Sequence, residues 1–143
     1  MNRSVLPGIL FVFGGVLLAA FPYVLLPVCS GGMTMASGAS VPMKCFWTAR
    51  AVLGTGLFIT FGGVVYCFCH NPGVRLGIAA MIAGAAVLAV AFPTILIGIC
   101  PTETMPCHMG TLPALILTGA VLFLAALGAC RVLSRAMKEN ASA

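Results

Sequence analysis

The segment Leu76–Ile99 reads LGIAAMIAGAAVLAVAFPTILIGI and contains no charged residue. An α-helix rises about 1.5 Å per residue, so about 20 residues cross the roughly 30 Å of hydrocarbon in a bilayer. Lipid offers no partners for backbone N–H and C=O groups, so an uninterrupted apolar segment of this length predicts a membrane-spanning helix rather than a strand. This segment decides the fold class, because it has no place in a small water-soluble domain.

Three further charge-free segments have the same character, at Val5–Val28, Ala51–Cys69 and Leu112–Cys130. The chain of 143 residues is 62% hydrophobic and 6% charged, whereas a soluble domain carries about 25% charged residues. A chain this short cannot hide so much apolar surface in one core. The sequence therefore predicts an all-α membrane protein, a four-transmembrane-helix bundle in contact with a lipid bilayer.

The basic residues predict the orientation of the four spans. Most of them lie at helix ends on one side of the membrane, namely Arg3, Arg75, Arg131, Arg135 and Lys138. The positive-inside rule then places both termini in the cytoplasm and the loops 29–50 and 100–111 outside it, in a multi-pass protein of the cell membrane. Although the net charge is +5, this clustering is typical of topology determinants, so we expect no binding of nucleic acid.

An internal repeat is the most informative feature of the sequence. The segment 20–29, AFPYVLLPVC, matches the segment 91–100, AFPTILIGIC, and a Met-x-Cys motif follows in each half, at 43–45 and 105–107. Each half is predicted to be one helix, an outer loop with two cysteines, and a second helix. Because both halves have the same orientation, this is a parallel repeat.

The repeat divides the chain into two tandem helical hairpins. Residues 1–75 form the first, and residues 76–143 form the second, which ends in a short basic tail. Pro22 and Pro93 occupy equivalent positions with several helical residues still to follow. Each proline removes a backbone hydrogen bond, so each is predicted to kink its span and to splay the outer ends of the first and third helices.

Several motifs lie in and beside the outer loops, in order over nearly the whole chain. They are Cys29, Met43-Lys44-Cys45-x-x-Thr48-Ala49-Arg50-Ala51, Gly98-x-Cys100, and Met105-Pro106-Cys107-His108-Met109-Gly110-Thr111 with Pro113-Ala114-Leu115. With these motifs the sequence resembles the four-span prokaryotic membrane proteins catalogued as domain-of-unknown-function family 4418. The resemblance implies the fold and the topology and no established activity. It also implies a partner, an export-type ATP-binding-cassette permease.

The sequence departs from that family at one position. In the family a histidine tends to follow the first Met-Lys-Cys, and Phe46 stands there in this chain. The departure puts in doubt that the two loops form equivalent histidine-containing sites. The second loop, with His108, is therefore the better candidate for any activity.

The outer cysteines Cys29, Cys45, Cys100 and Cys107 have a structural interpretation. Paired cysteines outside the cytoplasm tend to oxidise, and bridges within or between the loops would seat them on the helices. The leading prediction is therefore a non-enzymatic accessory or partner-binding subunit, serving a transport complex, with a disulfide-constrained outer cap.

Soft-metal binding is the first alternative. Thioether and thiolate ligands select Cu(I), and imidazole also suits copper. The candidate ligands for such a copper site are Met43, Cys45, Met105, Cys107, His108 and Met109. If the cysteines are oxidised, only the methionines and the histidine remain as ligands, so the two interpretations of the loops compete.

Thiol–disulfide catalysis is the second alternative. His108 beside Cys107 could lower the pKa of that thiol, and Arg50 and Lys44 add positive charge near Cys45. The Cys-x-x-Cys of such oxidoreductases is absent from both outer loops, so we expect enzymatic activity less than a structural role.

Two groups of residues complete the candidate sites. Arg50 and Lys44 run against the positive-inside bias. Pairing of either residue with Glu103, the only acid predicted outside the cytoplasm, would link the two loops. Arg50 could instead anchor its helix among the lipid headgroups. On the inner side lie Cys67, Cys69, His70 and Cys130. They fit a soft-metal site or acylation, but we expect small buried side chains that stay reduced.

Overall fold

A computed structural model of the chain describes residues 5–25, 32–34, 40–42, 44–98 and 110–142. The helices, in chain order, are α1 (Leu6–Ala20), η1 (Phe21–Leu25), α2 (Lys44–Phe68), α3 (Pro72–Ala91), η2 (Phe92–Leu96) and α4 (Leu112–Ser142), where η denotes a short π-helical segment. Between η1 and α2, the strands β1 (Gly32–Thr34) and β2 (Ser40–Pro42) pair antiparallel, with Met33 opposite Val41.

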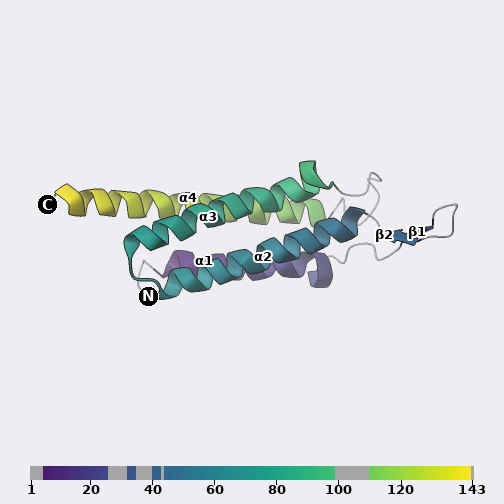
Figure 1. Ribbon diagram of the computed structural model, residues 1–143, viewed down its shortest axis with the longest axis horizontal. Helices are drawn as coiled ribbons and strands as arrows, with labels where there is room; N and C mark the ends of the chain where they lie inside the picture. Colours follow the sequence, from purple (N-terminus) through teal and green to yellow (C-terminus); the bar gives the residue numbers. More distant parts are fainter. Residues whose placement is uncertain (1–4, 26–31, 35–39, 43, 99–109, 143) are drawn as a thin grey trace.

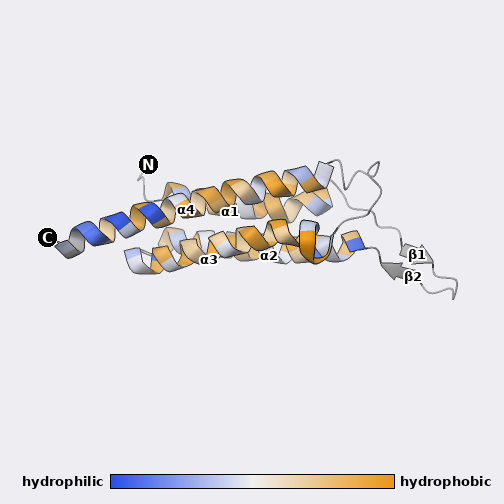
Figure 2. Cartoon of the chain, turned by 90° about the horizontal axis from the view of Figure 1, so that it is seen from above, coloured by the Kyte–Doolittle hydropathy of each residue, from blue (hydrophilic) through white to orange (hydrophobic). Residues whose placement is uncertain are grey.

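The helices confirm the predicted fold class. Four are long and apolar enough to cross a membrane, at Leu6–Val24, Lys44–Phe68, Pro72–Leu96 and Leu112–Glu139. Large apolar side chains point outward on all of them, among them Phe13, Phe61, Ile95 and Leu117. In Figure 2 hydrophobic residues run along the whole bundle, and hydrophilic residues gather on the C-terminal part of α4. This is the surface of a multi-pass membrane protein in contact with lipid.

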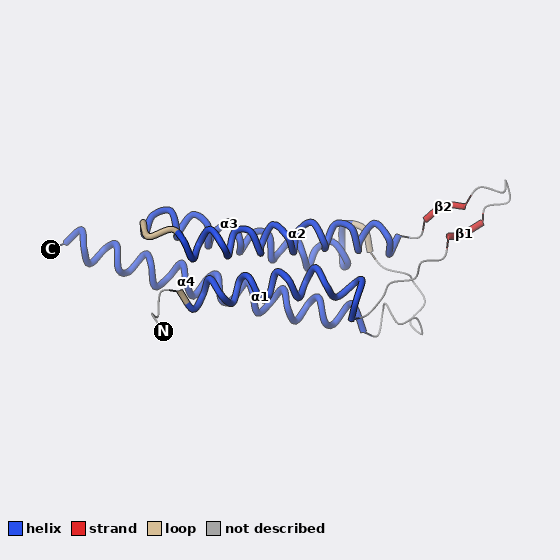
Figure 3. The backbone as a smooth tube through the Cα atoms, turned by 90° about the horizontal axis from the view of Figure 1, so that it is seen from below, coloured by secondary structure: helices blue, strands red, loops and turns tan. Residues whose placement is uncertain are grey.

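The bundle consists of two antiparallel hairpins packed side by side (Figures 1 and 3). α1 packs mainly against α2, and α3 mainly against α4, while α2–α3 and α1–α4 contacts join the pairs. α1 begins and α4 ends at one end of the bundle, which we call the tail end. At the opposite end, which we call the loop end, η1 and η2 finish and α2 and α4 begin.

The first hairpin is held together by close contact between glycines of α1 and α2. A Cβ on Gly56 would lie 2.7 Å from the Ala19 nitrogen and 2.7 Å from the Gly15 oxygen. A Cβ on Gly63 would lie 2.7 Å from the Val12 nitrogen. Small residues let helix backbones approach closely in lipid, where packing and not the hydrophobic effect drives association.

Larger side chains fill the centre of the bundle. Phe11, Leu18, Ile59 and Leu122 are completely or almost completely buried and belong to one core cluster with small residues of α3. α3 contributes mainly alanines to this cluster, such as Ala86. The described core is apolar, so the spans act as a packed scaffold, and the polar features lie at the two ends.

Several elements differ from the sequence prediction. α2 begins at Lys44, so the last residues of the predicted loop 29–50 form the first two turns of a helix. α4 continues past Cys130 to Ser142, since the tail is rich in good helix formers and contains neither glycine nor proline. The short β1–β2 pair was not predicted, because neither strand has an alternating pattern of useful length.

Candidate functional site

The loop end is organised by a hydrogen bond between the two hairpins. The Thr48 hydroxyl, in the second turn of α2, donates to the Gly98 carbonyl oxygen at 2.8 Å. Gly98 has a φ of +77°, a left-handed conformation that favours glycine. The N–H groups of Ile97 and Gly98 both donate to the Phe92 carbonyl, at 3.1 and 3.2 Å, so the turn that presents Gly98 is itself fixed.

Cys45 lies at the same end, one turn before Thr48. It sits in the first turn of α2, and its exposed fraction is 1%. The other outer cysteines, Cys29, Cys100 and Cys107, lie outside the described residues. The predicted bridges therefore stay predictions, and Cys45 is placed where a bridge would join a loop to the helical scaffold.

Most of the predicted metal ligands also lie outside the described residues, namely Met43, Met105, Cys107, His108 and Met109, as does Glu103. Copper binding and the pairing of Glu103 with Arg50 or Lys44 stay predictions for that reason. Within the described ranges, no three or more His, Cys, Asp or Glu side chains gather in a way that could hold a metal ion.

Arg50, predicted at the boundary between the first outer loop and the second helix, lies in the second turn of α2. Its guanidinium stands 5.0 Å from the centre of the Phe46 ring, and the rings of Phe46 and Trp47 meet edge-to-face with centroids 5.7 Å apart. Phe46 thus supports Arg50 through a cation–π contact. Arg50 and Lys44 are both exposed at the loop end.

Both repeat-related prolines mark a change of helical type. The α-helical part of each span ends just before the proline, and Pro22 and Pro93 are each the second residue of a π-helical segment. Both prolines are buried. The missing N–H of proline explains why the i→i−4 pattern is interrupted at both places.

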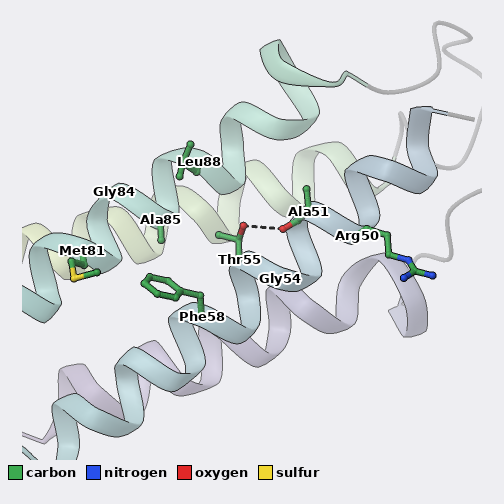
Figure 4. A pocket seen from close by; sticks show the side chains of 9 residues that line it. All are labelled: Arg50, Ala51, Gly54, Thr55, Phe58, Met81, Gly84, Ala85 and Leu88. Atoms are coloured by element: carbon green, nitrogen blue, oxygen red, sulfur yellow. Dashed lines mark hydrogen bonds between the residues drawn. The ribbon is translucent and has the colours of Figure 1, made fainter.

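A groove runs between α2 and α3 toward the loop end (Figure 4). Its volume is about 540 Å³. It is lined by Arg50, Ala51, Gly54, Thr55, Phe58, Met81, Gly84, Ala85 and Leu88. The groove was not predicted from the sequence, because it arises from the spacing of two helices that the chain connects only at the tail end.

The tail end contains a buried arginine, Arg75, which was predicted from the sequence only to be a topology determinant. Arg75 has an exposed fraction of 8%. Its Nε donates to the Cys69 carbonyl at 2.6 Å, and its guanidinium lies 5.1 Å from the centre of the Tyr66 ring. Arg75 therefore caps the C-terminal end of α2, where a cation also suits the helix dipole.

The remaining cysteines of the described ranges, Cys67, Cys69 and Cys130, form no disulfide and are partly buried. His70 is exposed in the turn between α2 and α3. Asn71 is the N-cap of α3, and its side-chain oxygen accepts from the Gly73 N–H at 3.0 Å. The short turn between α2 and α3 brings Arg75 back to the end of α2. The shortness of this turn is the feature of the sequence from which the capping of α2 by Arg75 could have been predicted.

Comparison with known proteins is informative at the level of the family. No curated protein and no solved structure matches the chain. One family model, described as a domain of unknown function (DUF4418), matches residues 10–132, a range that reaches from the first span into the fourth and contains both loops. The chain therefore belongs to the DUF4418 family of membrane proteins.

Proposed function

We propose that the protein is a non-enzymatic membrane subunit that binds a partner membrane protein, such as an ATP-binding-cassette permease, through its two outer loops. In this proposal the loops are extracytoplasmic and both termini are cytoplasmic, in the cell membrane. The distribution of arginine and lysine supports that orientation, and so does the position of the start of α1 and the end of α4 at one end of the bundle.

The observation that carries the proposal is the hydrogen bond from Thr48 to Gly98. It joins the helix that follows the first loop to the residue from which the second loop departs. The bases of the two loops are thus held in one geometry. A fixed base lowers the conformational entropy that the loops lose when a partner binds them.

The burial of Cys45 favours a structural bridge over redox catalysis. A thiol that exchanges disulfides must be reached by its reaction partner, so catalytic cysteines are partly exposed. Cys45 is 1% exposed, which suits a permanent bridge between the scaffold and a loop. We propose that Cys29, Cys45, Cys100 and Cys107 form two such bridges.

Site-specific photo-crosslinking tests the proposal in intact cells. A photoreactive phenylalanine analogue replaces Ser37 in the first loop or Thr102 in the second, and matched controls carry it at Phe61 and Leu124, which face outward on α2 and α4. The expected result is one membrane protein crosslinked from both loop positions and not from the helix positions. Crosslinks from the helix positions alone, or none from the loops, would contradict the proposal.

A further inference from the structure

The groove between α2 and α3 has the depth of one lipid leaflet. Along α2 it runs from Arg50 to Phe58, which at 1.5 Å per residue is about 12 Å. One leaflet contributes about 15 Å to the hydrocarbon core. The groove therefore begins at the loop-end surface of the membrane and finishes near its middle.

The lining of the groove is apolar below its mouth. Ala51 and Ala85 face it with Leu88 and Phe58, and of the described lining residues only Thr55 carries a hydroxyl. The Thr55 hydroxyl donates to the Ala51 carbonyl of its own helix at 2.9 Å (Figure 4). Because this hydroxyl already has an acceptor, the groove offers a hydrocarbon surface to whatever fills it.

Glycines keep the groove open at the loop end. A Cβ added at Gly54 or Gly84 would meet no atom within 4 Å. Further toward the tail end, a Cβ on Gly62 would lie 3.4 Å from the Ile82 side chain, and the pocket there is smaller, about 150 Å³. The space between α2 and α3 is thus concentrated in the loop-end half.

The mouth of the groove carries a positive charge. Among the described residues that line the groove, Arg50 is the only charged one, and its side chain points toward the loop end, away from Met81 and Phe58 (Figure 4). Within the described ranges the only carboxylate is that of Glu139, near the tail end of α4. The Phe46 ring lies against one side of the Arg50 guanidinium. The N–H groups of the guanidinium suit a phosphate.

We propose that this groove binds one phospholipid of the loop-end leaflet, with an anionic headgroup at Arg50 and an acyl chain between α2 and α3. A cation at one end and a hydrocarbon surface one leaflet deep complement the amphipathic form of such a lipid. A partner's transmembrane helix would use the whole membrane depth of about 30 Å, and the wide part of the groove ends at Phe58 and Met81.

Native mass spectrometry of the full chain tests this site. The protein is released from membranes that contain phosphatidylglycerol and phosphatidylcholine in equal amounts. The retained lipid is identified from the mass that it adds to the intact protein. Arg50→Gln removes the charge and Arg50→Lys keeps it. Gly84→Leu and Gly54→Leu fill the groove from opposite helices. Gly77→Leu and Gly128→Leu are matched controls, because a Cβ there also meets nothing within 4 Å and neither residue lines the groove.

The expected result is one retained phosphatidylglycerol per chain, preferred over phosphatidylcholine. Arg50→Gln should lower its retained fraction about fivefold, the scale of one exposed ion pair, and Arg50→Lys should lower it less. Both groove-filling variants should lose the lipid, and both controls should keep it. Equal retention in all folded variants would overturn the proposal. Crosslinking of the groove to a transmembrane helix of a partner, with no lipid retained, would also overturn the proposal.

Discussion

The Thr48 hydroxyl and the Gly98 carbonyl, fifty positions apart in the chain, meet at 2.8 Å. Thr48 also lies 3.3 Å from the Lys44 carbonyl of its own helix, so it has an acceptor in each hairpin. This hydrogen bond joins a side chain of the first hairpin to the backbone of the second. It ties the repeat together at the end where the loops emerge.

Replacing Thr48 by valine should destabilise the bundle. The change keeps the shape of the side chain and leaves the Gly98 carbonyl without its donor, so we expect a loss of about 1 kcal/mol in the free energy of unfolding. Thermal or denaturant unfolding in mild detergent measures it. Thr118→Val is the matched control, since the Thr118 hydroxyl bonds only to Ala114 on its own helix. Equal effects of the two substitutions would show that the contact between hairpins contributes nothing.

Gly63→Ala should separate α1 from α2. The added methyl would lie 2.7 Å from the Val12 backbone nitrogen, and a backbone atom cannot move without shifting its helix. We expect a loss of at least about 2 kcal/mol in the free energy of unfolding, as in other overpacked interfaces. Gly54→Ala, on the same helix but facing open space, should be neutral or stabilising, because alanine has the higher helix propensity. A Gly63→Ala protein as stable as Gly54→Ala would contradict the packing described for this hairpin.

Arg75→Met should weaken the tail end. It removes the hydrogen bond to the Cys69 carbonyl and the contact with the Tyr66 ring, and together these are worth about 2 kcal/mol. Arg75→Lys should recover part of this loss, because an ammonium donates to the carbonyl but does not lie flat on the ring. Unfolding in detergent measures both variants. The exposed Arg131→Met is the control, and an effect as large as that of Arg75→Met would show that charge alone matters.

The spans could be predicted from the sequence because lipid imposes a simple requirement on it. Long charge-free segments have one stable structure in hydrocarbon, and the four that the sequence shows are the four that the structure contains. The pairing into tandem hairpins also follows from the repeat. The equivalence of Pro22 and Pro93 extends to the structure, where each lies in a π-helical segment.

The ends of the bundle were harder to predict, because contacts there depend on how two helices meet. Nothing in the sequence marks Thr48 as the partner of Gly98, and a short polar side chain near a helix start has many local acceptors. Arg75 fitted the positive-inside pattern, which concealed its role as a buried cap. The groove beside Arg50 depends on the distance between α2 and α3, which no periodicity encodes.

The thiol count of the native protein tests the central claim, a loop cap fixed by bridges to the helical scaffold, most directly. The chain has seven cysteines. The protein is purified from membranes in mild detergent and unfolded without reductant in excess alkylating reagent. The mass of the intact, alkylated protein is then measured by mass spectrometry, and the metal content of the same preparation is determined. The account predicts alkylation of Cys67, Cys69 and Cys130 only, alkylation of all seven cysteines after reduction, and no stoichiometric copper. Alkylation of all seven before reduction, with copper bound, would contradict it.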